Sequence, residues 1–434
     1  MQLVIVAGGK GTRLKERLGG LPKPMVDIAG KPLLEHQVLL ARRYGIEDIV
    51  LLTGHGAEAI CDYFGDGSHW GTRIHYFEEN QPLGTAGAVL SALDQLAERF
   101  IVMYGDTMLN VDLSRFWRAH RASGSAASLF LHPNDHPADS DLVEIDESGY
   151  VVAFHPYPHD SSHYYANLVN AALYVIKRDA LLPWKGLRDV PDFGKHLFPR
   201  MLAEGCALNG YRSPEYIKDA GTPERLDKVI ADYESGRIER GSFATAAPAV
   251  FLDRDGTLNE EINRVKSADE LRVFDGVAAA IRRLNRSEYR TVVITNQPVV
   301  ARGDCTEAEL QRIHNRLETE LGREGAYLDA IYFCPHHPDK GFPGERADLK
   351  IRCDCRKPET GMIRRAIADL NLDLSRSWLI GDSSADTKTA ANAGIPSILV
   401  QTGHAGKDSR YPDQPGHVFP NLGAAVRFIL GESN

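Results

Sequence analysis

Short apolar runs recur along this 434-residue chain, and helical patterns lie between many of them. The runs are rich in Val, Ile and Leu without polar alternation, which is typical of parallel strands buried on both faces. The alternation of strands and helices predicts an α/β fold. We expect strands over residues 2–7, 48–53, 100–104, 249–252, 291–295, 330–333, 377–380 and 397–400, and helices over 31–44, 85–97, 223–235, 277–285 and 307–323.

Composition limits the class of protein further. The chain has 50 Lys and Arg against 59 Asp and Glu, a net charge of −9, and 43% of its residues are hydrophobic. These values are typical of a globular protein without a general basic surface, so we expect no nucleic-acid partner. The chain has no run of about 18 apolar residues, which predicts no membrane insertion, and we expect a cytoplasmic protein. The sequence leaves open whether the chain forms a homo-oligomer.

A change of composition predicts a domain boundary. Residues 235–248 are rich in Gly, Ser, Ala and Arg and have little apolar periodicity, and a new apolar run starts at Ala249. Such a stretch is typical of a linker. We therefore expect two catalytic domains, over residues 1–234 and 249–434, joined by a linker over 235–248.

The first apolar run ends in a glycine-rich turn. Gly8, Gly9 and Gly11 let the backbone turn sharply and approach a phosphate closely, and Arg13 adds a positive charge. No Gly-Lys-Ser/Thr follows, so this is not a Walker loop. Further on, Lys23 lies between two prolines that stiffen the chain around it. These residues predict a site for the phosphates of a nucleotide.

Two carboxylates accompany this loop. Asp106 comes just after the apolar run 100–104, where α/β sheets bind ligands, and Asp219 lies in Lys-Asp-Ala-Gly-Thr-Pro at 218–223. Two such carboxylates can hold one Mg²⁺ between the phosphates of a nucleotide and a sugar.

Together these motifs resemble those of the sugar-1-phosphate nucleotidyltransferases, over residues 1–234. The similarity covers Gly-Gly-x-Gly-Thr-Arg-Leu at 8–14, Pro-Lys-Pro at 22–24, Leu-Gly-Thr-Ala-Gly at 83–87, Gly-Asp at 105–106 and Asp-x-Gly-Thr-Pro at 219–223. The resemblance implies a Rossmann-like domain with a GT-A-like mixed sheet. It also implies attack of a sugar 1-phosphate on the α-phosphorus of a nucleoside triphosphate, with release of pyrophosphate and no covalent protein intermediate.

The same resemblance implies a role for each motif. Arg13 steadies the triphosphate, Lys23 binds the phosphates at the reacting centre, and Asp106 and Asp219 hold Mg²⁺. The expected substrate contacts are Gly8, Gly9, Gly11, Thr12 and Gly84 in the loops, Gln81 and Gly87 at the base, and Glu144 and Asn170 at the sugar. One departure is Phe154-His155-Pro156, where family members often carry a Glu-Lys pair, so a lysine contact to the sugar phosphate is absent or supplied elsewhere.

The second half of the chain also carries polar residues at expected strand ends. Asp253 and Asp255 follow the run 249–252, and residues two apart in an extended chain point the same way. One carboxylate can then attack phosphorus while the other transfers protons. Asp382 follows the run 377–380, and a divalent cation would offset the repulsion among these acids. Thr295 offers a hydroxyl group at another strand end, and Lys357 brings positive charge.

This set of motifs resembles the haloacid dehalogenase phosphatase superfamily, which implies a second Rossmann-like domain. By this resemblance Asp253 is the nucleophile that forms an aspartyl-phosphate, and Asp255 is the acid/base. Thr295, Asn296 and Lys357 bind the phosphoryl group, and Mg²⁺ is held by Asp253, the backbone carbonyl of Asp255 and Asp382. Asp386 either lies behind the metal ligands or caps the following helix.

Half of the six cysteines lie within a short stretch. Cys334 and His336 form one short-spaced pair, and Cys353 and Cys355 form another. Three sulfurs and one imidazole make a closed tetrahedral set, so we predict a structural Zn²⁺, with His337 as the alternative to His336. The cysteines at 61, 206 and 305 are expected to be ordinary packing residues.

The zinc motif resembles a narrower group. Cys-Pro-His-His-Pro, then Cys-Asp-Cys-Arg-Lys-Pro and Gly-Met at 361–362 resemble the D-glycero-D-manno-heptose-1,7-bisphosphate 7-phosphatases over 249–430, with histidinol-phosphate phosphatases as close relatives. Arg356 would then contact the distal part of the substrate. Two departures from the pattern lie near the expected substrate pocket: Pro298 and its neighbours replace Ser-Gly-Ile, and the stretch after Thr257 lacks the usual His-Gly-Tyr.

The two reactions would be consecutive, because removal of the 7-phosphate leaves the heptose 1-phosphate that a nucleotidyltransferase uses. The loop at 82–87 resembles that of mannose- and heptose-type guanylyltransferases, so GTP is the expected nucleotide. One alternative is a mannose-1-phosphate guanylyltransferase joined to a phosphatase for another sugar phosphate or for histidinol phosphate. Another is a sugar-nucleotide sensor or scaffold with one inactive domain.

Overall fold

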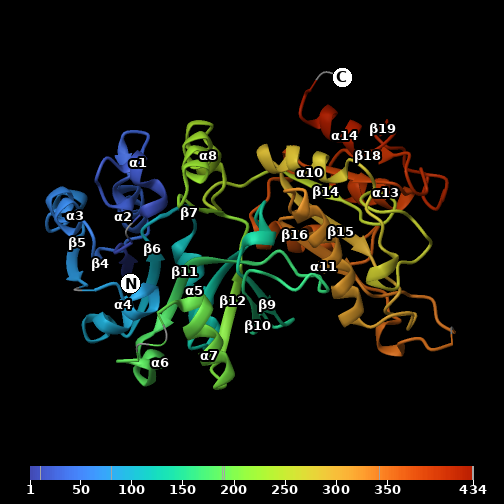
Figure 1. Cartoon of the computed structure of the whole chain (residues 1–434). Helices are drawn as coiled ribbons and strands as arrows, with labels where there is room; N and C mark the ends of the chain where they lie inside the picture. The colour runs from blue at the N-terminus through green and yellow to red at the C-terminus, as the bar shows by residue number, and fades with distance from the viewer. Residues whose placement is uncertain (10, 80, 188, 190, 342, 433–434) are drawn as a thin grey trace. The chain divides into compact units, whose positions relative to one another are not determined.

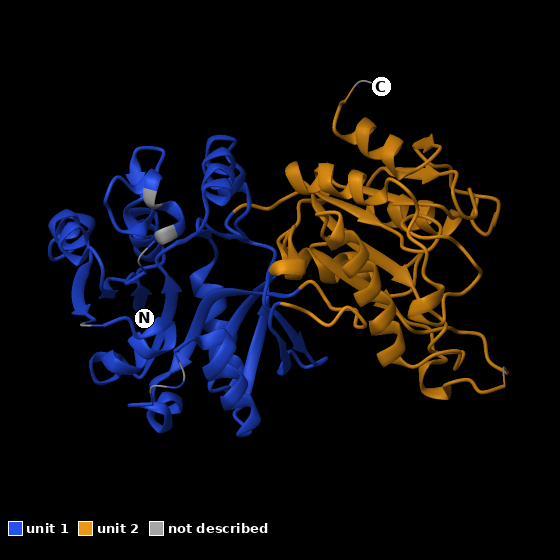
Figure 2. Cartoon of the chain, viewed as in Figure 1, with its two compact units in different colours: residues 1–132, 140–157, 168–244 blue, residues 133–139, 158–167, 245–434 orange. Residues whose placement is uncertain are grey.

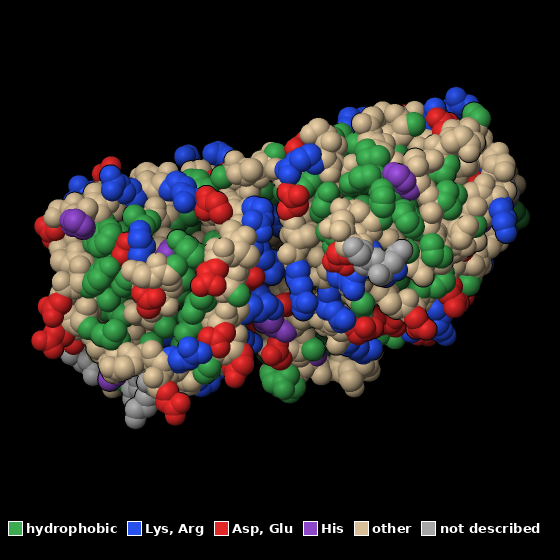
Figure 3. All heavy atoms as spheres, turned by 90° about the horizontal axis from the view of Figure 1, so that it is seen from above, with side chains coloured by type: hydrophobic (Ala, Val, Ile, Leu, Met, Phe, Trp, Pro, Cys, Tyr) green, Lys and Arg blue, Asp and Glu red, His purple; other side chains and the backbone are tan. Residues whose placement is uncertain are grey.

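The computed structural model describes residues 1–432 except 10, 80, 188, 190 and 342, and the side chains of Thr12 and Lys15 also lie outside the description. The chain divides into two compact units (Figure 2). Unit 1 comprises residues 1–132, 140–157 and 168–244, and unit 2 comprises 133–139, 158–167 and 245–434. On the face drawn in Figure 3, acidic and basic side chains are interspersed on both units. In the described part of the chain, no helix is both long and apolar enough to cross a bilayer.

A mixed sheet forms the centre of unit 1 (Figure 1). The strands run in the order β10-β9-β11-β6-β1-β4-β5, and β8 pairs with β11 and β12. β6, β1, β4 and β5 are parallel, whereas β11 is antiparallel to β6. The strand bounds are β1 Gln2–Val6, β4 Asp48–Thr53, β5 Arg73–Glu78, β6 Arg99–Tyr104, β8 Ala127–His132, β9 Leu142–Ile145, β10 Val151–His155, β11 Val169–Lys177 and β12 Leu208–Arg212.

Helices pack on both faces of this sheet, and two short ribbons complete the unit. The helix bounds are α1 Lys15–Leu18, α2 Leu33–Arg43, α3 Ala57–Phe64, α4 Gly84–Ala92, α5 Leu113–Ser123, α6 Arg178–Leu181, α7 Phe198–Ala203, α8 Pro223–Glu234 and α9 Arg237–Arg240. In the ribbons, β2 (Asp27–Ile28) pairs with β3 (Lys31–Pro32), and β7 (Thr107–Asn110) pairs with β13 (Tyr216–Asp219). Leu3, Ile5, Leu51 and Ile101 lie in the apolar core between the sheet and α2.

Unit 2 is built on a parallel sheet in the order β16-β15-β14-β17-β18-β19. This is the doubly wound arrangement, in which the strand order reverses at β14. The strands are β14 Ala249–Leu252, β15 Arg290–Asn296, β16 Ala330–Cys334, β17 Trp378–Gly381, β18 Ser397–Val400 and β19 His417–Phe419, and the helices are α10 Val277–Arg286, α11 Glu307–Arg323, α12 Gly361–Leu370, α13 Ser384–Ala393 and α14 Leu422–Ile429. The α/β architecture expected from the sequence is confirmed in both units.

The expected elements differ from the observed ones mainly at helix ends. Each expected strand is found, with ends that shift by at most one residue. The helix expected over 31–44 begins only at Leu33, because Lys31 and Pro32 pair as a strand with Asp27 and Ile28. The helix expected over 85–97 ends at Ala92 and continues as the 3₁₀ turn Leu93–Gln95.

Two segments from the first half of the sequence belong to unit 2, whereas we expected a continuous first domain. Residue 165 bonds to α11 through both backbone groups: Tyr165 N donates to Thr319 Oγ1 at 3.0 Å, and Thr319 Oγ1 donates to Tyr165 O at 3.2 Å. Asn167 N donates to the buried Glu318 carboxylate at 3.3 Å. The boundary between 244 and 245 falls inside the expected linker, which contains α9. The limits of the catalytic domains stay a prediction.

Candidate active sites

The candidate site of unit 1 lies where β1 and β6 end side by side. The two strands are parallel, and Gly105 N donates to Val6 O at 2.9 Å, just beyond the end of β6. Asp106 follows at once, and Thr107 then pairs with Asp219 in the β7–β13 ribbon. Pairing of these strands brings the two predicted metal-binding carboxylates, 113 residues apart in sequence, to neighbouring positions.

Two predicted phosphate-binding cations meet these carboxylates. Lys23, only 8% exposed, forms an ion pair with Asp106. A Cβ at Gly221 would lie 2.8 Å from Asp219 Oδ1, 3.2 Å from Lys23 Nζ and 3.7 Å from Arg13 Nη2, so three charged side chains surround this glycine. The structure therefore brings together Arg13, Lys23, Asp106 and Asp219, the four residues predicted to bind the phosphates and the metal.

Arg225 completes this cluster and was missed by the sequence analysis. Its Nη1 donates to both carboxylate oxygens of Asp219, at 3.0 and 2.9 Å, and Gly221 N donates to Asp219 Oδ1 at 3.0 Å. Arg225 stands one turn into α8, six residues after Asp219, and that spacing is the only signal that could have found it. Three cations face two carboxylates here, so the cluster suits a polyanion accompanied by a divalent cation.

In the glycine-rich loops of unit 1, the backbone packs closely against other backbone segments. A Cβ at Gly54 would lie 3.3 Å from Gly8 Cα, so the turns after β1 and β4 pack backbone to backbone. Gly84 has φ +76° and lies against the carbonyl of Pro191, which also accepts from Ala86 N at 3.0 Å. Gly9 and Gln81 are exposed, Gly11 and Gly87 are half-buried, and the side chain of Thr12 lies outside the described residues.

The predicted sugar contacts lie on neighbouring strands. Glu144 on β9 bonds to His155 on β10, with Nε2 and Oε2 3.0 Å apart, so the departure from the family's Glu-Lys pair still places a basic ring beside the carboxylate. Asn170 stands near the start of β11, and its Nδ2 would lie 2.8 Å from a Cβ at Gly194. β11 bulges just after Asn170, where Ala172 adopts φ +55°, a strained conformation that often marks functional sites.

The candidate site of unit 2 lies at the carboxyl ends of β14, β15 and β17, where the strand order reverses. Asp253 follows β14, Thr295 is the next-to-last residue of β15, and Asp382 follows β17. Asp253 N donates to Ile380 O at 3.0 Å, which continues the pairing of β14 and β17 beyond the strand ends. Ligands of doubly wound sheets bind at this place.

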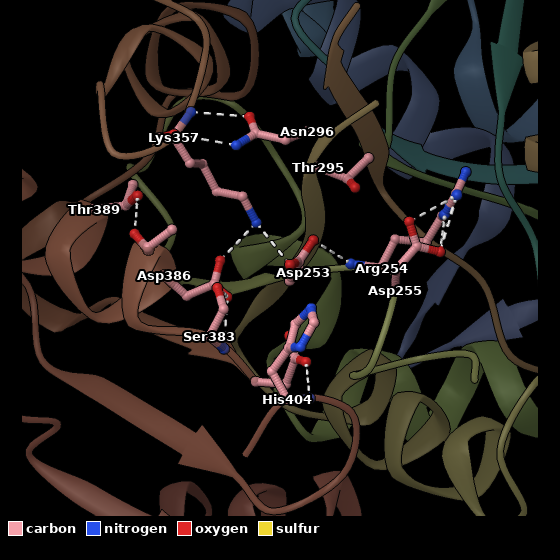
Figure 4. Close-up of polar contacts among 12 residues, drawn as sticks. Asp253, Arg254, Asp255, Thr295, Asn296, Lys357, Ser383, Asp386, Thr389 and His404 are labelled. Atoms are coloured by element: carbon pink, nitrogen blue, oxygen red, sulfur yellow. Dashed lines mark hydrogen bonds and ion pairs between the residues drawn. The ribbon is translucent and has the colours of Figure 1, made fainter. Parts of the chain in front are cut away.

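Three carboxylates and one lysine converge at this edge (Figure 4). Oxygens of Asp253, Asp382 and Asp386 all lie within 4.8 Å of one another. Lys357 Nζ lies 2.9 Å from Asp253 Oδ2 and 2.6 Å from Asp386 Oδ1. Burial and mutual repulsion raise the pKa of Asp253 to about 7 and that of Asp382 to about 8. The excess of two negative charges and the all-oxygen donor set fit one Mg²⁺ ion.

The sequence suggested that Asp386 lies behind the metal ligands or caps the following helix, and the structure places it more directly in the site. It caps α13, since its Oδ2 accepts from Ser383 N at 3.1 Å and from Ser383 Oγ at 2.6 Å. Its other oxygen bonds to Lys357, which makes Asp386 a member of the carboxylate cluster as well. One side chain thus fixes both the start of a helix and the position of the lysine.

Asp255 points to a different set of partners. Its carboxylate accepts from Arg254 Nε and Nη2, from Asn259 Nδ2 at 2.9 Å and from Gln297 Nε2 at 2.7 Å. Burial alone would raise the pKa of Asp255, but the Arg254 guanidinium and these donors outweigh it and hold the pKa below its usual value. The Arg254 side chain is fully buried, and Figure 4 shows it beside Asp255. The carboxylate of Asp255 is not part of the metal-binding group, and a role for its backbone carbonyl stays a prediction.

The loop after β18 closes the site and was not found from the sequence. His404 N donates to Asp382 Oδ2 at 2.6 Å, and Gly406 N donates to Asp382 O at 2.8 Å. Gly403 and Gly256 have positive φ and pack so closely on the Asp382 carboxylate that neither can carry a side chain. The sequence Gly-His-Ala-Gly at 403–406 was a recognisable signal for a tight loop.

The other predicted phosphate-site residues form a connected set. Asn296 Oδ1 accepts from Lys357 N at 2.9 Å, and Asn296 Nδ2 donates to Lys357 O at 3.1 Å. Gln297, which was not predicted, donates to both Thr295 Oγ1, at 2.9 Å, and Asp255. The departure at Pro298 is accommodated, because its carbonyl accepts from Arg302 N at 2.9 Å at the start of a tight turn.

The predicted zinc ligands gather in one place. The Sγ atom of Cys355 lies 3.1 Å from that of Cys334 and 3.3 Å from that of Cys353, and His336 Nδ1 lies 3.3 Å from Cys355 Sγ. The hydrogen bond that joins Cys355 and Cys334 lowers the pKa of Cys355 to about 5, so the group offers a thiolate at neutral pH. Three sulfurs and one imidazole nitrogen at these distances fit a tetrahedral zinc site. Arg356 Nη1 donates to His336 O at 3.1 Å, which ties this loop to the neighbouring Lys357.

Comparisons with known proteins give independent matches for the two halves. A family model described as nucleotidyl transferase matches residues 2–236, and one described as HAD-hydrolase-like matches residues 354–425. The chain is 40% identical over 159 residues to the D-glycero-beta-D-manno-heptose-1,7-bisphosphate 7-phosphatase of Haemophilus ducreyi, which covers 36% of this chain and 85% of that protein. It is also 40% identical over 189 residues to the D-glycero-D-manno-heptose-1,7-bisphosphate 7-phosphatase of Thermosynechococcus vestitus, covering 42% of this chain and 95% of that protein.

Solved structures similar to the chain include one for each half. HddC from Yersinia pseudotuberculosis, complexed with GMP-PN, is 26% identical, with a TM-score of 0.45, and the match covers 54% of this chain and 99% of HddC. The D,D-heptose 1,7-bisphosphate phosphatase from B. bronchiseptica, complexed with magnesium and phosphate, is 36% identical, with a TM-score of 0.38, over 43% of this chain and 99% of that one.

Proposed function

Because the chain belongs to the nucleotidyl transferase family over its N-terminal half and to the heptose-1,7-bisphosphate 7-phosphatases over its C-terminal half, we propose that it catalyses two consecutive reactions on one sugar. Unit 2 removes the 7-phosphate of D-glycero-D-manno-heptose 1,7-bisphosphate. Unit 1 then joins the heptose 1-phosphate to the nucleotidyl group of a nucleoside triphosphate, with GTP as the expected donor, and releases pyrophosphate. The product is an NDP-heptose.

The observation that carries this proposal is the presence of both families in one chain. The relatives of the C-terminal half carry the name of a phosphatase whose product keeps its 1-phosphate, and the match spans 85% or more of two of them. A sugar 1-phosphate is the acceptor that the resemblance of unit 1 implies. Each half also presents a cluster of charged side chains at a sheet edge, which supports activity in both.

In the phosphatase reaction, an oxygen of Asp253 attacks the phosphorus of the 7-phosphate, and the sugar oxygen leaves. Lys357, which contacts Asp253, binds the phosphoryl oxygens, and Thr295 and Asn296 position them. Asp255 gives a proton to the leaving sugar oxygen and then takes one from the water that hydrolyses the aspartyl-phosphate and frees Asp253. Its lowered pKa favours the second, basic role. A Mg²⁺ ion held by Asp253 and Asp382 would neutralise charge on the phosphoryl group.

In the transferase reaction, a phosphate oxygen of the sugar attacks the α-phosphorus, and pyrophosphate leaves. Arg13 and Lys23 bind the phosphates, and Arg225 fixes the Asp219 carboxylate in place. Asp106 and Asp219 would hold a Mg²⁺ ion that offsets the charge of the triphosphate. Glu144 and Asn170 contact the sugar, and His155, paired with Glu144, supplies the basic group that the missing lysine would have given.

The test uses the full chain with heptose 1,7-bisphosphate and GTP, and follows inorganic phosphate and pyrophosphate separately. The unmodified chain should release both. Asp253→Asn should abolish the release of phosphate and also of pyrophosphate, because the transferase then lacks its acceptor. Addition of heptose 1-phosphate should restore pyrophosphate release to this variant.

Asp106→Asn is the reciprocal control and should release phosphate at the normal rate but no pyrophosphate. Pyrophosphate release by Asp253→Asn from the bisphosphate alone would contradict the order of the reactions. Parallel assays with ATP, CTP, mannose 1-phosphate and histidinol phosphate test the substrate assignment. Faster turnover of any of these would overturn the assignment of GTP or of the heptose.

A further inference from the structure

Gln297 connects two groups that the phosphatase reaction uses for different purposes. It follows β15 directly, and its side chain is only 1% exposed. Its amide nitrogen Nε2 donates to Asp255 Oδ2 at 2.7 Å and to Thr295 Oγ1 at 2.9 Å. Its backbone N donates to Cys334 O at 2.8 Å, which fixes the residue against β16. One amide group therefore joins the acid/base to a hydroxyl group of the phosphoryl site.

The Asp255 carboxylate determines which way this amide faces. An ionised carboxylate only accepts hydrogen bonds, so the nitrogen of the amide, and not its oxygen, must lie against Asp255. The second N–H group then reaches Thr295 Oγ1, which is the acceptor of that bond. In the view of Figure 4, Thr295 stands between Lys357 and Asp255.

This bond leaves the hydroxyl hydrogen of Thr295 without a partner. Thr295 is 1% exposed, and no described residue accepts this hydrogen. A buried hydroxyl hydrogen without an acceptor is costly. It is therefore left to bond an oxygen of the bound phosphoryl group.

The two oxygens of Asp255 are held differently. Oδ1 accepts from Arg254 Nε at 3.1 Å, from Arg254 Nη2 at 2.9 Å and from Asn259 Nδ2 at 2.9 Å. Oδ2 accepts from the same Nη2 at 2.9 Å and from Gln297. Three donors occupy Oδ1, so Oδ2 is the oxygen with room to exchange a proton with the substrate. Gln297 fixes this oxygen from the side of Thr295.

From these contacts we propose that Gln297 is a positioning residue of the phosphatase reaction. Its amide group holds Asp255 Oδ2 beside the phosphoryl site and makes the Thr295 hydroxyl a donor to the phosphoryl group. This inference rests on the proposed phosphatase activity of unit 2. In the first step an Asp253 oxygen bonds to phosphorus, the bond to the sugar oxygen breaks, and Oδ2 gives its proton to that oxygen. In the second step Oδ2 takes a proton from water, whose oxygen bonds to phosphorus and releases Asp253.

The test compares the full chain with Gln297→Met, which keeps much of the shape but has no donor, on phenyl phosphate and on heptose 1,7-bisphosphate with Mg²⁺. Loss of a hydrogen bond to a charged group should lower kcat about 10- to 100-fold on both substrates. The Mg²⁺ concentration at half-maximal activity should stay unchanged, because Gln297 bonds to none of the clustered carboxylates. Gln311→Met is the matched control: it changes an exposed glutamine of α11 that bonds to Asn315, and both quantities should stay at the parent level.

Two further variants separate positioning from a structural role. Gln297→Glu keeps the shape but replaces the donor by an acceptor, so it should not recover kcat. Orthovanadate, which mimics the pentacoordinate phosphorus, should inhibit Gln297→Met about 10- to 100-fold less strongly than the parent chain. Adding Gln297→Met to Thr295→Val should cost less in kcat than adding it to the parent chain, because the two residues share one hydrogen bond.

Unchanged kcat or unchanged vanadate inhibition in Gln297→Met would overturn the proposal, as would strictly additive losses with Thr295→Val. A loss of Mg²⁺ affinity equal to the loss of kcat would also overturn it, because that result indicates a general disruption of the site. A parent chain that hydrolyses phenyl phosphate but not the bisphosphate would refute the proposed substrate and not the role of Gln297.

Discussion

Removal of the Lys357 ammonium group tests the charge balance of the phosphatase site most directly. The side chain is 2% exposed and contacts Asp253 and Asp386 at 2.9 and 2.6 Å. At an effective dielectric constant of about 20, each contact is worth roughly 6 kcal/mol before the cost of burying the ions is counted. Because that cost offsets much of the gain, Lys357→Met should destabilise metal-free unit 2 by about 3–5 kcal/mol.

Calorimetric unfolding of the full chain, with and without Mg²⁺, measures this effect, and the transition of unit 1 serves as an internal reference. Lys388→Met is the matched control. Lys388 has one partly exposed ion pair, with Asp413 at 3.2 Å, so its loss should cost less than about 1 kcal/mol. Mg²⁺ should stabilise Lys357→Met more than the parent chain, because the variant presents three carboxylates with no cation.

The pH dependence and a double variant sharpen the test. The raised pKa values of Asp253 and Asp382 mean that the metal-free fold loses stability as pH rises towards about 8 and these groups ionise. The deficit of Lys357→Met should therefore grow from pH 6 to pH 8. Adding Asp386→Asn removes one unpaired charge and should recover part of the loss. A deficit below 1 kcal/mol at pH 8, or no recovery in the double variant, would refute this reasoning.

Three further predictions follow from the same geometry. Protons compete with the metal at Asp253 and Asp382, so the affinity for Mg²⁺ should rise more than about tenfold between pH 6 and pH 8. The dependence of phosphatase activity on Mg²⁺ concentration measures this affinity, and an affinity that does not change with pH would contradict the prediction. Cys355→Ser should lower the zinc content below the expected level of about one ion per chain, and it should lower the melting temperature of unit 2. Cys305→Ser is the control and should change neither quantity. Atomic absorption measures the zinc content, and equal zinc in both variants would exclude this site. A Cβ at Gly322 of α11 would lie 2.5 Å from the ring of Pro137, in segment 133–139. Gly322→Leu should therefore destabilise unit 2 by roughly 1–3 kcal/mol, measured by urea unfolding. An unchanged unfolding midpoint would show that this contact is dispensable.

Local patterns were enough to place the main charged residues at sheet edges. Asp253 follows an apolar run directly, and Asp106 and Asp382 each follow one after a single glycine. A strand signal is local, so the strand end can be read without knowledge of its neighbours. The zinc ligands were found in the same way, since two short-spaced pairs define the set. The departure at Pro298 was also visible, although its consequence was not.

Contacts between distant residues required the tertiary structure. Gln297 reaches Asp255 from the neighbouring strand, and pairing of β7 with β13 places Asp219 beside Asp106. No local pattern specifies such partners, because they depend on which strands become neighbours and how far each side chain extends.

The sequence by itself determined the chemistry of this protein: two α/β halves, with acids, cations and glycines at the ends of apolar strands. Only the tertiary structure decided how those charges are balanced, with Lys23 on Asp106 and Lys357 shared by Asp253 and Asp386. It also decided that segments 133–139 and 158–167 pack in unit 2. The physical reason is that residue type and periodicity act along the chain, whereas charge pairing and burial depend on groups that folding brings together from distant positions.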